Sequence, residues 1–200
     1  MIAPGEYKCI FLKVINHFIG TAVIIKTEVM NDKAFAQEFA RELQAEVPST
    51  AKCLERIPLE KFDWKPHERS MQLGYLALLT GEIPRWITHI ILHPEIDLAT
   101  FEHPHPKTAG ELAQLFKESV EEAVQTLNKV EDDDLNEKFE LKTNGDVVLS
   151  STKREQVAQC INHMVHHRGQ LTVYMRLLDI PVPSIYGPSA DDRSFAGKST

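Results

Sequence analysis

The chain has 200 residues, of which 42% are hydrophobic and 26% charged, and this composition is typical of a globular protein with one sizeable core. Its formal net charge of -7 and isoelectric point near 5.7 exclude a broad basic surface, so nucleic acids are disfavoured as partners and small molecules or proteins are favoured. Three cysteines without C-x-x-C spacing indicate a reducing compartment, and we expect a cytoplasmic protein.

The first segment of the chain differs from the rest in composition. Residues 9–25 are strongly apolar, but polar residues interrupt them and they fall short of the ~20 apolar residues that a membrane-spanning helix needs. Glu6 precedes this apolar run and no small-residue cleavage site follows it, which argues against a secretory signal. We therefore expect residues 1–29 to be an N-terminal extension. Either it lies outside the native domain, with Met30 as the functional start, or it is a natural part of the chain.

The first helix is predicted to start at Asn31 or Asp32, because both residue types favour the N-cap position. Apolar residues recur at helical spacing from there onward. Pro48 should bend or interrupt this helix, so we expect it to run in two pieces as far as Pro58.

A second helix is expected after Ser70, which can serve as its cap. Pro84 should kink this helix, because proline lacks the backbone donor and crowds the preceding turn. Residues 93–106 contain three prolines among acidic residues and histidines, and this composition predicts a long loop.

Two further helices are predicted by their capping boxes, Thr108-Ala-Gly-Glu111 and Thr152-Lys-Arg-Glu155. Between them, residues 139–149 surround an Asn-Gly pair and predict a small hairpin. Four helices without alternating βα segments predict an all-α four-helix bundle with long connections. After the last helix, residues 180–188 should form an extended tail laid over the bundle by Ile185 and Tyr186.

The sharpest chemical signal is the H-x-x-x-H pair in the last predicted helix. His163 and His167 are one turn apart on the same face, within reach of a single metal ion through neutral imidazole nitrogens. His166 does not share that face. A third ligand would have to come from another helix. The alternative interpretation is a half-buried polar edge, with backbone or water partners for both rings.

Several motifs together resemble the DinB-like family over residues 30 to about 192, with residues 193–200 as a disordered tail. They are Phe62-Asp-Trp64-Lys-Pro66, Glu82-Ile-Pro-x-Trp86, Asn162-His-x-x-His166-His167 and Pro183-x-Ile-Tyr-Gly-Pro-Ser189. The resemblance implies a four-helix bundle and a homodimer. It also implies a three-histidine site for a divalent metal, commonly zinc or nickel, with one ligand from the second helix and two from the H-x-x-x-H of the fourth. Some relatives are thiol-dependent transferases or isomerases that use bacillithiol, mycothiol or related cofactors.

By this resemblance, His163 and His167 are metal ligands, but the second-helix position holds Leu79, which cannot coordinate a metal. Either another group supplies the third ligand, or metal binding is weak, or the site is a metal-free pocket. Glu82 lies three residues further along and can complete the ligand set or act as a catalytic base. Its other interpretation is structural, as a partner of Arg168, because a half-buried carboxylate needs a cationic or donor partner.

Other candidates carry weaker signals. Tyr174 and Gln170 can orient a substrate, whereas Trp64 and Trp86 are expected in the core. Five further histidines lie in or beside connections, where a histidine is usually solvated: His67, His89, His93, His103 and His105.

Two functions follow from these residues. The first is a divalent-metal-dependent enzyme of the thiol-dependent transferase or hydrolase type, in which the metal lowers the pKa of a thiol or water. The second is a non-catalytic, metal-free binding or dimerisation bundle associated with stress, and Leu79 favours it.

Overall fold

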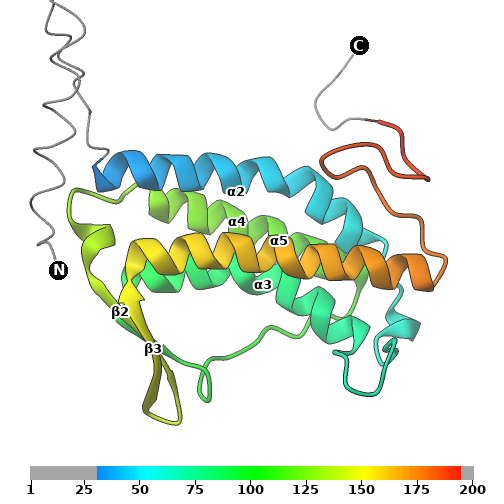
Figure 1. Ribbon diagram of the computed structural model, residues 1–200, viewed down its shortest axis with the longest axis horizontal. Coiled ribbons are helices and arrows are strands. Elements are labelled where there is room, and N and C mark those ends of the chain that lie inside the picture. Colours follow the sequence, from blue (N-terminus) through cyan, green and yellow to red (C-terminus); the bar gives the residue numbers. More distant parts are fainter. Residues whose placement is uncertain (1–30, 195–200) are drawn as a thin grey trace, which may run out of the picture.

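The computed structural model describes residues 31–194, which form four long helices and a small three-stranded sheet (Figure 1). The expected extension, 1–29, and the last six residues of the expected tail lie outside the described residues. The helices are α2 (Asp32–Glu55), α3 (Leu73–Leu92), α4 (Ala109–Leu127) and α5 (Lys153–Leu177), with short 3-10 turns η1 (Leu59–Lys61) and η2 (Asp134–Asn136). The predicted four-helix bundle is therefore confirmed.

The sheet makes a strictly all-α description too narrow. Its strands are β1 (Glu95–Asp97), β2 (Lys138–Thr143) and β3 (Asp146–Thr152), in that order, with β1 parallel to β2 and β2 antiparallel to β3. The predicted hairpin is β2–β3, and its turn residues Asn144 and Gly145 have φ of 52° and 85°. The Asp97 carboxylate accepts hydrogen bonds from both turn amides, at 3.0 and 2.7 Å, and so ties β1 to the hairpin. Part of the expected loop 93–106 is thus an edge strand.

Proline positions show where packing overrides local preference. α2 runs without interruption through Pro48 to Glu55, so the predicted break is wrong. The residues after the proline, Ser49 to Ala51, are buried against the bundle, and this packing holds the helix together although one backbone bond is lost. α3 also continues through Pro84, where the prediction was a kink and not a break. Figure 1 shows both helices changing direction along their length.

Helix starts agree with the predictions in part. Asn31 caps α2 by accepting from the Ala34 amide at 2.9 Å, whereas the N-cap of α3 is Gln72 rather than Ser70. At α4, the Thr108 hydroxyl accepts from the Glu111 amide at 3.0 Å, but Glu111 does not reach back to Thr108. Its carboxylate instead accepts from the preceding amide, that of Lys107, at 2.7 Å.

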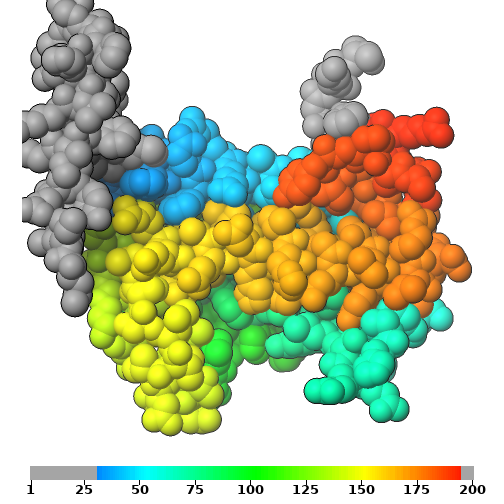
Figure 2. Space-filling model, viewed as in Figure 1, coloured from blue at the N-terminus to red at the C-terminus, as the bar shows by residue number. Residues whose placement is uncertain are grey.

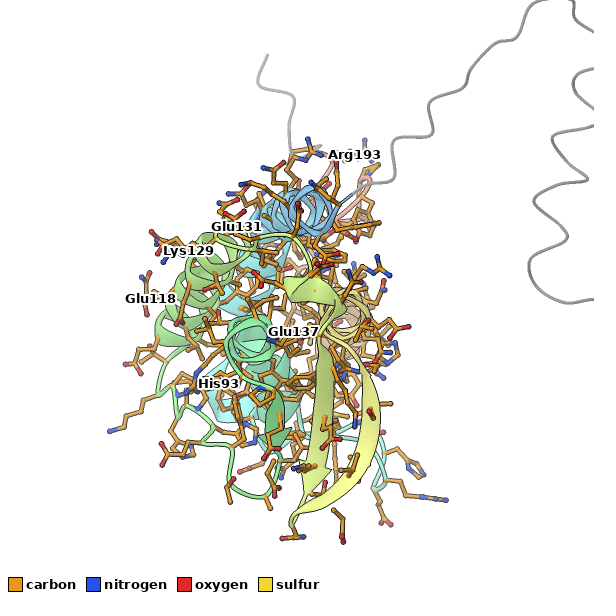
Figure 3. All side chains as sticks on the ribbon, turned by 90° about the vertical axis from the view of Figure 1, so that its left-hand side faces the viewer. His93, Glu118, Lys129, Glu131, Glu137 and Arg193 are labelled. Atoms are coloured by element: carbon orange, nitrogen blue, oxygen red, sulfur yellow. The ribbon has the colours of Figure 1, made fainter. Side chains whose placement is uncertain are left out.

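The core lies between α3 and its neighbours. α3 packs against both α4 and α5, and α2 covers α4 and, to a lesser extent, α5. Figure 3 looks along the bundle from the end where the hairpin leaves it, with Glu137 near the hairpin's base. None of the helices within 31–194 is both long and apolar enough to cross a membrane.

The chain after α5 lies over the C-terminal parts of α2 and α5 (Figure 2). Arg56 donates to the Pro181 carbonyl at 2.9 Å, and Arg176 pairs with Asp191 at 2.6 Å. Ile185 packs against the core. This placement confirms the predicted tail.

Candidate functional site

The site begins with α5, whose start is fixed by a complete capping box. The Thr152 hydroxyl accepts from the Glu155 amide, and the Glu155 carboxylate accepts from the Thr152 amide at 2.9 Å. From this start, helical spacing brings His163 and His167 onto one face. We call these two residues the histidine pair.

The rings of the histidine pair face each other through their outer nitrogens. Nε2 of His163 and Nε2 of His167 are 2.6 Å apart. Nδ1 of His167 is 2.8 Å from Oε1 of Gln170, an oxygen that only accepts, so Nδ1 carries the proton. In the neutral ring Nε2 then has a free lone pair, and it accepts a hydrogen bond from Nε2–H of His163.

Burial keeps the histidine pair neutral. The pKa of His163 is lowered first by desolvation and then by the neighbouring His167 and His166. Desolvation also lowers the pKa of His167, against a smaller raising effect of the Gln170 hydrogen bond. His167 is only 4% exposed, whereas His166 is exposed and is not part of the Nε2–Nε2 contact. Neutral imidazoles are the form that binds metals.

Contacts at the two ends of α3 and α5 show how far along the bundle Leu79 lies relative to the histidine pair. At one end Lys153 Nζ donates to the Ile91 carbonyl at 2.9 Å, and at the other the Tyr174 hydroxyl donates to the Met71 carbonyl at 3.3 Å. The two helices are therefore antiparallel. Because both rise equally per residue, counting inward from either end places Leu79 level with the histidine pair.

Leu79 also lies on the face of α3 that meets α5. It precedes Trp86 by seven residues, or two turns, and the Trp86 ring lies 6.1 Å from the His163 ring between centroids. Leu79 is buried, with 6% exposure. Within 31–194, no three histidine, cysteine, aspartate or glutamate side chains gather closely enough to hold one metal ion. The second-helix position thus supplies packing and no ligand.

Glu82 does not pair with Arg168, so the partner that the structural interpretation named is wrong. Its buried carboxylate accepts through Oε1 from Trp86 Nε1 at 3.2 Å and lies 2.7 Å from Nδ1 of His103. Arg168 instead faces α2 and pairs with Glu46. The helix face that each residue occupies, and not the sequence spacing between them, decides this pairing.

An apolar pocket of about 430 Å³ adjoins the histidine pair. Trp86 and His163 form one wall, and the sheet forms another through Phe139 and Leu141. Cys160 also lines it, but burial raises the pKa of this thiol to about 12, so it is not a thiolate nucleophile. Trp86 is half-buried and borders the pocket, so it is more than the core residue that was predicted.

The remaining candidates are dispersed. Tyr174 lies near the C-terminal end of α5, where its hydroxyl donates to the Met71 carbonyl. Its ring meets the Trp64 ring edge-on, with centroids 5.6 Å apart. The rings of His89 and His93 lie next to each other at the end of α3, with centroids 5.4 Å apart.

Two loop histidines, His67 and His105, are exposed, as expected of solvated residues. His103 is the exception, because a buried carboxylate binds it. Its position in a proline-rich loop concealed this contact from sequence reasoning.

Comparisons with known proteins agree with this fold. The crystal structure of a DinB-like protein, YjoA, from Bacillus subtilis superposes with a TM-score of 0.58 over 78% of this chain and 99% of that chain, at 19% identity. A DinB-like protein from Bacillus cereus ATCC 10987 gives a TM-score of 0.57 over 74% of this chain and 95% of that chain, at 26% identity. 

At the sequence level, the uncharacterized protein YrdA of Bacillus subtilis (strain 168) is 53% identical over 32 residues. That match spans 16% of this chain and 19% of YrdA, so it is a local similarity. The sequence profile of the DinB family, in contrast, matches residues 30–195. The chain therefore belongs to the DinB family.

Proposed function

We propose that this protein is a divalent-metal-dependent enzyme of the hydrolase or thiol-dependent transferase class, with His163 and His167 as its protein ligands. The observation that carries the proposal is the 2.6 Å approach of their two Nε2 atoms. Two nitrogens bound tetrahedrally to zinc, each about 2.0–2.1 Å from the metal, lie about 3.3 Å apart. To hold an ion, the two rings would have to rotate slightly away from each other, and the proton on Nε2 of His163 would have to move to Nδ1 of the same ring, which leaves both Nε2 lone pairs free.

The residues fit a metal held by two histidines and do not fit a three-histidine set. Leu79 occupies the position of the third ligand. Its side chain is buried there and offers no donor atom to a metal. The remaining coordination positions would be open to water or to a substrate thiol. We expect weaker binding than at a site with three protein ligands, and zinc or nickel suits imidazole donors.

The chain's own residues prepare this chemistry. A bound divalent ion would lower the pKa of a water or thiol that binds to it. Gln170 holds the ring of His167 in the tautomer that leaves the Nε2 lone pair free, and burial favours the neutral form of both imidazoles. The apolar pocket beside Trp86 would exclude water and receive the apolar part of a small-molecule substrate. Roles for Glu82 as a base and for Tyr174 in orienting substrate remain predictions.

Metal titration of chelator-treated protein, purified without a metal-affinity column, tests the proposal. Isothermal titration calorimetry with zinc and with nickel should show one ion per chain in the wild type. His163→Ala and His167→Ala should abolish binding, whereas His166→Ala, which removes the exposed neighbour, should retain it. Absence of stoichiometric binding by the wild type would refute the proposal.

Leu79→His tests the position of the missing ligand. Because Leu79 is level with the histidine pair on the facing helix, the new imidazole should raise metal affinity strongly. An unchanged affinity in a folded variant would place the metal elsewhere.

A second candidate is a non-catalytic binding or dimerisation bundle without metal. The buried leucine at position 79 favours it, since this position offers no donor. It predicts that His167→Ala leaves oligomeric state and ligand binding unchanged, as measured by analytical ultracentrifugation and calorimetry. Metal-dependent thiol transfer by the unmodified protein would exclude it.

A further inference from the structure

A second pair of reactive side chains, Glu82 and His103, lies beside Trp86. The Glu82 side chain is 1% exposed, and its Oε1 accepts the Trp86 indole N–H at 3.2 Å and meets His103 Nδ1 at 2.7 Å. Its other oxygen, Oε2, is buried and has no hydrogen-bond partner among residues 31–194. In the same part of the chain, His103 is the only ion-pair partner of this carboxylate. Burying a carboxylate with one oxygen left unsatisfied costs free energy, and such a group in a folded protein calls for an explanation.

The hydrogen bond to Glu82 sets the tautomer of His103. An ionised carboxylate only accepts, so the Nδ1 atom of His103 carries the proton and donates it. The Nε2 atom of the neutral ring then holds a lone pair, and no described residue donates to it. The His103 side chain is 34% exposed, so one side of the ring is open to solvent.

The loop around His103 is held in place rather than loosely solvated. Arg85 Nη1 donates to the Glu102 carbonyl at 3.0 Å, and its guanidinium lies 5.3 Å from the centre of the Phe101 ring. The Phe101 ring in turn meets both Trp86 and His103 edge-on, with centroids 6.0 and 5.8 Å away. The Glu82 carboxylate and the Phe101 ring therefore both hold the His103 imidazole in its orientation without any ligand.

We propose that Glu82 and His103 form a carboxylate–imidazole pair that presents Nε2 of His103 as a proton acceptor to an O–H or S–H group of a small molecule that reaches the exposed part of the His103 ring from solvent. In the transfer, the O–H or S–H bond breaks, its electron pair stays on oxygen or sulfur, and the proton forms a new N–H bond at Nε2. The resulting imidazolium lies next to the Glu82 carboxylate, as in the histidine–carboxylate part of a catalytic triad. His103 is the acceptor, and Glu82 is a positioning residue that acts through it. The pair requires no metal at His163 and His167.

The tautomer of His103 is the first test. Long-range 1H–15N correlation spectra of the full chain should show His103 protonated at Nδ1 in its neutral form. Glu82→Gln keeps an oxygen acceptor and should preserve this tautomer. Glu82→Met removes the acceptor and should shift the equilibrium toward the Nε2–H form by about tenfold, the effect of losing one charge-assisted hydrogen bond. Glu102→Gln, which removes a neighbouring exposed charge, should change nothing.

Acylation by diethyl pyrocarbonate, followed per residue by mass spectrometry, tests whether the Nε2 lone pair is reachable. His103 should react in the wild type, and Glu82→Met should slow it by about twofold or more, since a tenfold shift from a mostly Nδ1–H ring moves about half of the lone-pair population to the inward-facing Nδ1. Exposed His105 in the same loop serves as the internal reference and should keep its rate.

An Nε2–H tautomer in the wild type, or unchanged His103 reactivity in a folded Glu82→Met variant, would overturn the proposal. If Glu82→Met does not fold, the wild-type tautomer and the Glu82→Gln spectrum decide the question. Because these measurements use metal-free protein, their outcome is separate from that of the metal titration.

Discussion

Arg168 is the largest fully buried side chain of the protein's described part, with 1% exposure, and it joins three segments of the chain. Its guanidinium donates to the Glu46 carboxylate and, at 3.1 and 2.9 Å, to the hydroxyls of Ser49 and Thr50, all on α2. The other Nη donates to the Tyr186 hydroxyl at 2.7 Å, and this hydroxyl donates to Glu46 at 2.9 Å. α5, α2 and the C-terminal tail thus share one closed network.

We predict that Arg168→Met lowers the free energy of unfolding by about 3–5 kcal/mol, the usual cost of leaving a buried charge without its partner. Glu46, which is 8% exposed, would be that uncompensated charge. For a domain of this size, the loss corresponds to a fall in Tm of about 6–20 °C. The double variant Glu46→Leu with Arg168→Met removes both charges and should recover most of the loss, because a buried ion pair adds little over apolar packing.

Urea unfolding followed by circular dichroism measures these differences. Arg176→Met on the same helix is the matched control: it breaks the exposed pair with Asp191 and should shift the midpoint little. A loss below about 1 kcal/mol for Arg168→Met, or no recovery in the double variant, would refute the reasoning about the buried charge.

Three further predictions use the same structure. The lowered pKa values of His163 and His167 mean that the folded protein binds fewer protons than the unfolded chain between those values and the ordinary 6.5. The free energy of unfolding should fall as pH drops through this window, and His163→Asn should flatten the fall in a pH series of urea unfolding curves. Gly74→Ala would place a Cβ 2.7 Å from the Phe62 ring and should cost about 1–3 kcal/mol in thermal melts, whereas an unchanged melt would show that the ring yields freely. Cys160, whose pKa burial raises to about 12, should resist iodoacetamide in the native state as followed by mass spectrometry, and rapid labelling would contradict its burial.

The histidine pair could be predicted from the sequence because its geometry is local. Two residues four apart on a helix share a face whatever the rest of the fold does, and the capping box that starts α5 is local as well. The rings therefore meet as expected, with 2.6 Å between their Nε2 atoms. The hairpin at Asn144-Gly145 was predictable for the same reason, since the turn itself selects these residues.

The partners of Glu82 could not be found in this way. The sequence suggests Arg168, a distant cation, as the partner in one of the two interpretations of Glu82, and it places His103 in a loop where a histidine is usually solvated. In the structure, Glu82 meets His103 across 21 positions, and Arg168 meets Glu46 across 122. Which of several cations reaches a carboxylate depends on how the helices are rotated against each other, and helical periodicity does not contain that information.

By itself, the sequence determined the four helices, the hairpin, the tail and the two facing histidines, because helix periodicity, capping and turn chemistry act over a few residues. Tertiary structure alone decided that α2 continues through Pro48, that β1 joins the sheet, and that Leu79 is buried level with the histidine pair. The reason is that packing of the bundle supplies more free energy than one missing backbone hydrogen bond removes. It also sets which side chains of separate elements share a buried space.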